Sequence, residues 1–326
     1  MKTKTKDVSA NGSADSITDL ARQIAAPVLQ VPKSRLWLFY ARDAYTTARH
    51  MQAALEARPT LEVLGIGPGH VFNPGQRVDL SAIIKQAGYA PDVVCVMDGC
   101  APMEILGLES FKGPKLLYLL DTHLKPDRPE STQYDRVFVA HRQTLALYSG
   151  AIWLPHAADP EIHKELSLPR VYDVAFVGGT DLAEVHWRRR KLLRALIESG
   201  MTVWAGRTTG LWLSFIYSKS RLVFNCTVKG DLNMRVFEGA MCRRLVLNDR
   251  PHPEAGYLES GWEDGKTIVY YDDETLVEKA RYYLAHDDER EAIATAAREW
   301  ALETHTYAIR CHDLLAAAAD VVMRRG

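Results

Sequence analysis

Long apolar runs, each followed by a helix-like segment, most constrain what this chain can fold into. The runs "DVVCVMDG" (92–99), "KLLYLLDT" (115–122) and "YDVAFVGG" (172–179) are apolar along most of their length. A strand with one solvated face alternates apolar and polar side chains, whereas a strand buried on both faces does not. Such strands alternating with helices predict an α/β fold, in which parallel sheets are covered by helices on both sides.

The strand–helix pattern occurs in two halves, which predicts two Rossmann-like, doubly wound domains joined by a linker. In the first half, strands are expected at 35–41, 61–67, 92–99, 115–122, 136–141 and 151–155, and helices at 44–57, 80–88 and 142–150. In the second half, strands are expected at 172–179, 201–206, 221–226, 244–249 and 266–272, with helices at 188–199, from 234 onward, and twice more before Gly326. The break lies at 154–170, which holds three prolines and no periodicity.

Composition excludes several classes of protein. Forty basic and 41 acidic residues leave a formal net charge of -1, so no global field favours nucleic acid. Five cysteines without a C-x-x-C pair argue against a disulfide framework or a structural zinc site. No run approaches the ~20 apolar residues that span a bilayer, and the start lacks a signal peptide. We expect a cytoplasmic protein without a transmembrane segment, and a disordered tail at 1–15.

In parallel sheets, ligands bind beyond the carboxyl ends of the strands, so the cleft between the two domains is the expected site. One loop there carries Gly178 and Gly179, which let the backbone approach a ligand closely. The helix after them opens with a basic cluster at 188–191, although helix N-termini favour acidic side chains. A bound phosphate would explain the cluster, with Arg188 the member expected to reach the cleft. A solvated basic face is the alternative.

A second loop, "GDLNMRVFEGAMC" (230–242), leads into a mainly apolar helix. Asp231 or Asn233 is a natural N-cap. Arg235 and Glu238 share one face by their spacing, and Gly239 beside them leaves room for close approach. The functional interpretation is that Glu238 accepts hydrogen bonds from sugar hydroxyls while the helix end and Arg235 face a diphosphate. A buried ion pair linking helix to loop is the structural alternative.

A third loop, "YLLDTHLKP", places Asp121 and His123 just beyond a buried strand. An Asp–His pair can serve as an oriented general base, and a histidine alone can bind a substrate hydroxyl. A turn held by an Asx-type hydrogen bond at Asp121, with an exposed His123, is the structural alternative.

The stretch "GIGPGH" (65–70) suggests a glycine-rich turn lining the cleft, with His70 near the acceptor, or a chance match. The other histidines show no ligand spacing and are expected to be structural or exposed. At position 156 a capping role is favoured over a place in the cleft.

Residues 172–179 and 230–242, together with "WLPHAADPEIH" and the segment 282–310, resemble glycosyltransferases of the spore-maturation (CgeB-like) type, within the GT-B group. The resemblance runs from about Lys115 to Arg310. It implies two facing domains, with a C-terminal helix crossing back onto the first. The division it implies is 16–155 for an acceptor domain, 156–304 for a nucleotide-sugar domain and 305–326 for the crossing helix.

The same resemblance implies an enzyme of the hexosyltransferase type. It would move a sugar from a nucleotide-diphosphate sugar to a hydroxyl of a glycan, protein or small-molecule acceptor. By position, Gly178 and Gly179 would lie under the phosphates, Asn233 and Arg235 near the diphosphate, and Glu238 at the ribose or sugar hydroxyls. The first domain would supply the catalytic base, for which Asp121 and His123 match best. The resemblance implies no cofactor.

Two further points follow from the residues. No D-x-D lies at a strand end, so we expect arginines and helix ends, without a metal ion, to balance the diphosphate. Relatives usually carry glycine directly after the position of Cys242, where this chain has Arg243. The turn is therefore built differently, or Arg243 adds a positive charge near the donor. A nucleotide-sugar epimerase or phosphorylase on the same fold, or a non-catalytic nucleotide-binding subunit, remains an alternative.

Overall fold

The computed structural model describes residues 33–43, 47–98, 103–181 and 184–325. The tail expected at residues 1–15 lies outside these ranges. Residues 34–326 form one compact unit that holds two parallel sheets. In the described part of the chain, every helix falls short of the length or the apolar character needed to span a bilayer. The four described cysteines are all free and buried.

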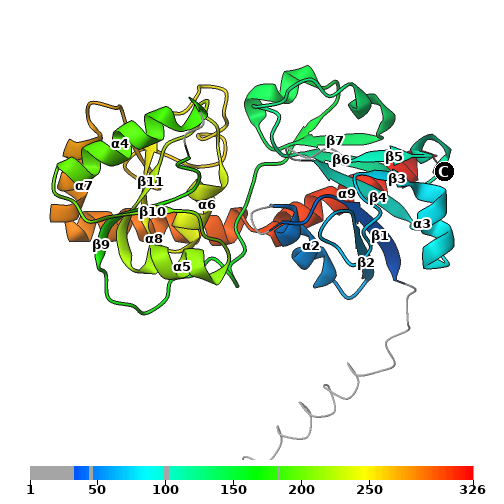
Figure 1. The fold of residues 1–326 in the computed structure, drawn as a ribbon, viewed down its shortest axis with the longest axis horizontal. Coiled ribbons are helices and arrows are strands. Elements are labelled where there is room, and N and C mark those ends of the chain that lie inside the picture. The colour runs from blue at the N-terminus through cyan, green and yellow to red at the C-terminus, as the bar shows by residue number, and fades with distance from the viewer. Residues whose placement is uncertain (1–32, 44–46, 99–102, 182–183, 326) are drawn as a thin grey trace, which may run out of the picture. The chain divides into compact units, whose positions relative to one another are not determined.

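The first sheet has six strands in the order β2-β1-β4-β6-β7-β8, and every neighbouring pair is parallel (Figure 1). The strands are β1 (Ser34–Phe39), β2 (Leu61–Ile66), β4 (Val93–Asp98), β6 (Lys115–Leu119), β7 (Arg136–Val139) and β8 (Ile152–Trp153). The central strands are buried on both faces, as their continuous apolar runs predict.

Helices cover both faces of this sheet. Helix α2 (Ala48–Glu56) and the last helix, α9 (Tyr307–Arg325), pack on one face. On the other face lie α3 (Leu80–Ala87) and a small parallel pair of strands, β3 (Arg77–Asp79) with β5 (Glu104–Leu106). Helix α3 begins where the side chain of Asp79 accepts hydrogen bonds from the backbone N–H groups of the first turn, which stabilises that end.

The second sheet has five strands in the order β10-β9-β11-β12-β13, again all parallel. The strands are β9 (Tyr172–Val177), β10 (Val203–Gly206), β11 (Ser220–Asn225), β12 (Leu245–Asp249) and β13 (Val269–Tyr271). One face packs against α4 (Trp187–Glu198) and α7 (Leu276–Ala285), and the other against α5 (Leu211–Ser218) and α6 (Met234–Met241). Helix α8 (Asp287–Thr304) contributes to both cores. The predicted doubly wound architecture is confirmed.

The chain crosses between the halves twice, and the two crossings are hydrogen-bonded to each other. Ala158 N–H donates to the His305 carbonyl over 3.0 Å, and Tyr307 N–H donates to the Ala158 carbonyl over 3.2 Å. Beyond this point α9 lays Tyr307, Cys311 and Leu314 into the core of the first sheet. These positions follow helical spacing, which gives α9 one apolar stripe.

Three expectations for local structure are wrong. Residues 142–150 form a short 3₁₀ helix at Arg142–Leu147, where an α-helix was expected. After β13, three helices follow within the described residues, where two were expected, because the chain bends at His286 and at His305. Helix α5 has no counterpart among the expected elements. Its sequence, "LWLSFIYS", is apolar on nearly every side and therefore carries no amphipathic period.

Arg243 has a left-handed backbone conformation, which glycine adopts most readily. Its φ is 53°, and among the described non-glycine residues it alone has a positive φ. Its guanidinium Nε donates to Glu165 over 2.8 Å, and its Nη2 lies 3.2 Å from Glu291. The turn is therefore of a kind that favours glycine, and it is occupied by a strained arginine whose side chain is held by two carboxylates and does not line the cavity.

We expect Arg243→Gly to be more stable than Arg243→Ala by about 1 kcal/mol, because only alanine retains the strain of the left-handed backbone. Both variants lose the contacts with Glu165 and Glu291, so their comparison isolates the backbone term. Urea unfolding of the two variants measures the difference. Equal stability, or a more stable alanine variant, would show that position 243 carries no strain.

Candidate active site

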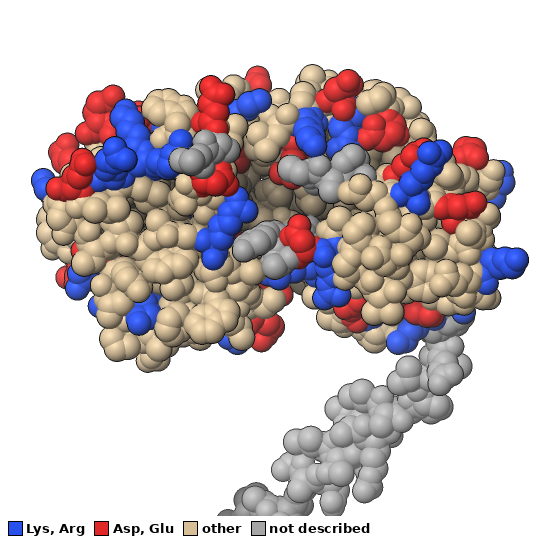
Figure 2. All heavy atoms as spheres, viewed as in Figure 1, with Lys and Arg blue, Asp and Glu red and all other residues tan. Residues whose placement is uncertain are grey.

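A cavity of about 520 Å³ lies at the carboxyl ends of both sheets. Its walls come from the loops after β6 and β9, from α6 and from the segment linking the halves. Figure 2 shows a hollow in the face in view, with acidic and basic side chains around it. Of the site residues expected from the sequence, those that line the cavity are Asp121, His123, Gly178, Gly179, Asn233, Arg235 and Glu238. Arg188 does not line it.

Gly178 and Gly179, directly after β9, leave space that other side chains occupy. A Cβ at Gly178 would lie 2.9 Å from the Phe176 ring and 3.1 Å from Nη2 of Arg235. A Cβ at Gly179 would lie 2.7 Å from the His186 ring. Neither glycine has a positive φ among the described backbone conformations. The pair is therefore needed for close approach of Arg235 and of any ligand, and not for an unusual turn.

Helix α6 is capped by Asn233. Its Oδ1 accepts a hydrogen bond from the backbone N–H of Arg235 over 3.2 Å. Asp231, the other expected cap, instead accepts bonds from the N–H groups of Val228 and Lys229 within its own loop, over 3.1 and 3.4 Å. Both Asn233 and Asp231 line the cavity. Asn233 caps the helix, whereas Asp231 is held by backbone N–H groups of its own loop.

Arg235 is held rigidly at the cavity wall. Its Nε donates to the Val177 carbonyl over 2.8 Å, Nη1 donates to Asn225, and the guanidinium lies 4.9 Å from the centre of the Phe176 ring. Such cation–π packing fixes the plane of the guanidinium. A fixed cation at the end of a strand and beside a helix N-terminus is suited to an anionic ligand.

Glu238 lies one turn further along α6 and is 6% exposed. Burial raises the pKa of its carboxyl group to about 7, although the charges of Arg235 and Arg49 oppose the shift. Its Oε1 lies 3.7 Å from Nε2 of His163, which is too long for a hydrogen bond. Burial is the main cause that lowers the pKa of His163 to about 3, and the charge of His50 is the second cause. His163 is therefore neutral near pH 7, and the two side chains form no ion pair there.

Gly239 has a different role from the one expected. A Cβ there would lie 2.7 Å from Cγ2 of Val246 and 3.3 Å from Cγ1 of Val223. The residue thus faces strands β12 and β11 and not the cavity. Its small size lets α6 pack closely onto the sheet, which in turn fixes the position of Glu238 beside it.

The raised pKa of Glu238 predicts a stability change with pH. Between about pH 4.5 and about pH 7 the folded state retains a proton that the unfolded state has released, so stability falls as pH rises through this window. Glu238→Gln removes the titration. We expect the variant to gain about 2.5 kcal/mol in free energy of unfolding relative to the unmodified protein as pH rises from about 5 to about 8, at about 1.4 kcal/mol per pKa unit. Urea unfolding at both pH values tests this, and a constant difference between the proteins would contradict it.

The loops after β6 and β7 contribute a group of histidines. The ring centres of His123 and His141 are 4.0 Å apart, and those of His141 and His156 are 5.3 Å apart. Burial lowers the pKa of His123, and burial together with the neighbouring rings holds the pKa of His141 well below its usual range. Asp121 lies at the same wall. The second half reaches this wall too, since Nζ of Lys229 donates to the His123 carbonyl over 2.9 Å.

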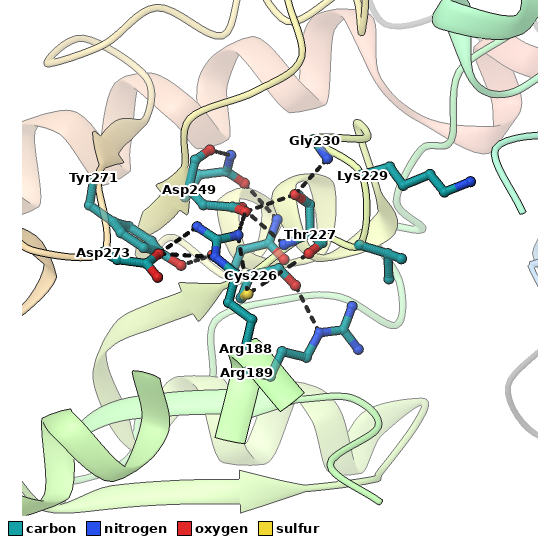
Figure 3. Close-up of polar contacts among 12 residues, drawn as sticks. Arg188, Arg189, Cys226, Thr227, Lys229, Gly230, Asp249, Tyr271 and Asp273 are labelled. Carbon is teal, nitrogen blue, oxygen red and sulfur yellow. Dashed lines mark hydrogen bonds and ion pairs between the residues drawn. The ribbon is translucent and has the colours of Figure 1, made fainter. Parts of the chain in front are cut away.

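Of the basic cluster, Arg189 lines the cavity and Arg188 does not. Arg188 forms ion pairs with Asp249 over 2.5 Å and with Asp273 over 2.7 Å (Figure 3). Arg189 is 5% exposed, and its Nε donates to the Cys226 carbonyl over 2.8 Å. Burial, followed by the charge of Arg235, lowers its pKa to about 10, so it remains a cation near pH 7. The sequence could have indicated that Arg189 points inward. At helical spacing it shares a face with the buried Leu192, Leu193 and Leu196.

Two other expectations about the cleft are wrong. The turn at 65–70 does not line the cavity, and the His70 ring instead packs edge-on against Tyr40 at 4.5 Å. The histidines that sequence reasoning assigned to structural, capping or exposed roles, but that line the cavity, are His50, His141, His156 and His163. They follow different elements, so only the folded chain brings them together.

Comparison with known proteins connects this geometry to a fold. Residues 161–316 match the sequence model of a family described as glycosyl transferase-like. Sucrose-phosphate synthase from Thermosynechococcus elongatus is similar in structure, with a TM-score of 0.62 and 12% identity over 90% of this chain and 100% of that one. A glycosyltransferase from Rickettsia africae gives 0.60 and 11%, over 89% and 99%. The chain has the GT-B fold.

A third GT-B structure, Anabaena Alr3699/HepE in complex with UDP and glucose, gives a TM-score of 0.61 and 10% identity, over 88% of this chain and 99% of that one. The sequence matches no curated protein. In this GT-B chain the family match covers the second sheet, its helices and the first half of α9. That segment includes the glycine pair, Arg189 and the polar face of α6.

Proposed function

We propose that this protein is a glycosyltransferase of the hexosyltransferase and spore-maturation type. It would move a sugar from a nucleotide-diphosphate sugar to an acceptor hydroxyl. The observation that carries the proposal is one cavity with two chemically distinct walls. Arg189, Arg235 and the capped end of α6 lie at one wall, and Asp121 and His123 lie at another. The Anabaena neighbour holding UDP and glucose supports the choice of donor class.

In this proposal the donor diphosphate lies against Gly178, Gly179 and Arg235. The C–O bond between the anomeric carbon and the diphosphate breaks, and the diphosphate takes the electron pair. Arg189, Arg235 and the N-terminal end of α6 offset the charge that develops on it, in place of a metal ion at the diphosphate. Arg188 is not one of these groups, because its guanidinium is already paired with Asp249 and Asp273.

The acceptor completes the reaction from the other wall. Its hydroxyl oxygen attacks the anomeric carbon, and its proton passes to the Asp121–His123 group. Glu238 would accept hydrogen bonds from hydroxyls of the donor sugar or ribose. A buried carboxylate with no hydrogen bond of normal length to His163 has acceptor capacity for such hydroxyls.

The test is incubation of the full chain with a panel of nucleotide sugars, with and without sugar, peptide and small-molecule acceptors. Release of free nucleoside diphosphate that depends on an acceptor, together with a glycosylated product, is expected. An epimerised sugar without acceptor would indicate an epimerase. Binding of nucleotide sugar without any turnover would indicate a non-catalytic subunit. Either of these two results would overturn the proposal.

A further inference from the structure

Three side chains at the cavity wall have the composition of a metal site. Ligand atoms of Asp121, His123 and His141 all lie within 4.8 Å of one another. Asp121 and His123 follow β6, and His141 follows its parallel neighbour β7. The carboxyl ends of neighbouring parallel strands meet at one edge of the sheet, which brings these loops together. A D-x-D motif lies within a single loop, whereas these three residues come from two separate loops.

His141 provides a second, independent observation. It is 1% exposed, and neither ring nitrogen has a hydrogen-bond partner among the described residues. The Leu120 carbonyl lies close enough to raise its pKa but forms no hydrogen bond of normal geometry with it. Nδ1 of His123 and Nδ1 of His156 are also buried and unpartnered. Leaving such nitrogens unsatisfied costs free energy, and a bound cation would pair with one nitrogen of each ligating ring.

We propose that Asp121, His123 and His141 bind one divalent transition-metal ion of the zinc type. Two imidazole nitrogens and one carboxylate oxygen match the donor set that such ions prefer. Ligand atoms about 2.0–2.1 Å from one tetrahedral ion lie roughly 3.4 Å apart, so small side-chain rotations close the set. Three protein ligands leave one coordination position, and all three residues line the cavity.

The surroundings carry charges of both signs. Asp231 is 3% exposed and is fixed beside the rings by backbone N–H groups, so a second carboxylate offsets the charge of a cation. Lys229 and Arg189 also act on His123, in the opposite sense. The buried thiols do not compete, because none of the four described cysteines lines the cavity.

The role of the metal rests on the proposed function. With the metal bound, Asp121 and His123 would act as ligands and not as the base. The open position would take the oxygen of the acceptor hydroxyl, and the proton of that hydroxyl would pass to the Asp231 carboxylate, which also lines the cavity. The metal would then lie at the acceptor wall, away from the diphosphate. Binding of the metal is measured without nucleotide or acceptor, so the site and the transfer reaction are tested separately.

The experiment is titration of the chelator-treated, full-length protein with Zn²⁺ by calorimetry, and with Co²⁺ by visible absorption. We expect one ion per chain. His141→Gln and Asp121→Asn, which keep side-chain size, should each weaken binding by at least about 100-fold, since even outer-shell changes cost about 10–100-fold. Thermal unfolding without metal shows whether each variant folds. His312→Gln is the matched control, because His312 is an exposed histidine beside Asp313.

The outcomes are distinct. Loss of binding in His141→Gln and Asp121→Asn, with binding kept in His312→Gln, supports the site. Absence of binding, or binding that either His141→Gln or Asp121→Asn retains, overturns it. Azide added to the Co²⁺ form tests the open position: a shift of the visible bands is expected, and unchanged bands would show that no exchangeable position faces the cavity.

Discussion

Glu238→Gln is expected to weaken binding of the nucleotide-sugar donor by about 10- to 100-fold while leaving the protein folded. The carboxylate faces the cavity and has no hydrogen bond of normal length to His163, so ligand hydroxyls are its natural partners. A hydrogen bond to a charged group contributes about 1.5–3 kcal/mol, which sets the size of the effect. Glutamine keeps the shape but loses the charge, and it removes the cost of burying that charge.

The measurement is calorimetric titration with UDP-sugar near pH 8, where Glu238 is ionised. Glu303→Gln serves as the control, because Glu303 is exposed at the end of α8. Unchanged donor affinity in Glu238→Gln would remove the residue from the donor site. Loss of the folded state would show instead that the carboxylate is a structural group of the core.

His123→Ala is expected to lower turnover by about 10²- to 10⁴-fold and to change donor affinity less than about threefold. The histidine and Asp121 follow β6 of the first sheet, whereas Arg235 lies on α6 of the second half, and groups that handle a proton in the transition state contribute this much to rate. The same split is expected whether the ring takes the proton itself or holds a metal ion that stabilises the acceptor oxygen, because neither role involves the donor.

Single-turnover kinetics and donor titration of the same preparation separate the two effects. His312→Ala is the control, since its side chain is 75% exposed. A fall in donor affinity as large as the fall in turnover would place His123 at the donor instead. Turnover equal to that of the unmodified protein would exclude it from the reaction.

The sequence was sufficient for the sheets and for most of the predicted residues that line the cavity from the second half. Apolar runs identify strands that are buried on both faces, and Asn233 caps α6 as its residue type indicates. The Gly178–Gly179 pair marks the end of β9, where a ligand loop is expected. Each of these features depends on residues that are close together in the sequence, so the sequence alone can reveal it.

The site features that the sequence did not predict depend on contacts between distant segments. Arg188 and Arg189 are adjacent in sequence, and the presence of Asp249 and Asp273 decides which of them faces the cavity. The histidines at the acceptor wall come from the loops after β6 and β7 and from the linker between the halves. A single histidine in each loop carries no pattern, and only strand order reveals that the loops adjoin.

The return of α9 has a consequence for how this protein is made. The face of the first sheet that holds Leu36, Tyr118 and Phe138 is covered by residues from Tyr307 onward. A chain emerging from the ribosome therefore exposes that apolar surface until the residues of α9 are synthesised. The half that is translated first is the half that finishes folding last, and loss of the final helix would harm the opposite end of the sequence.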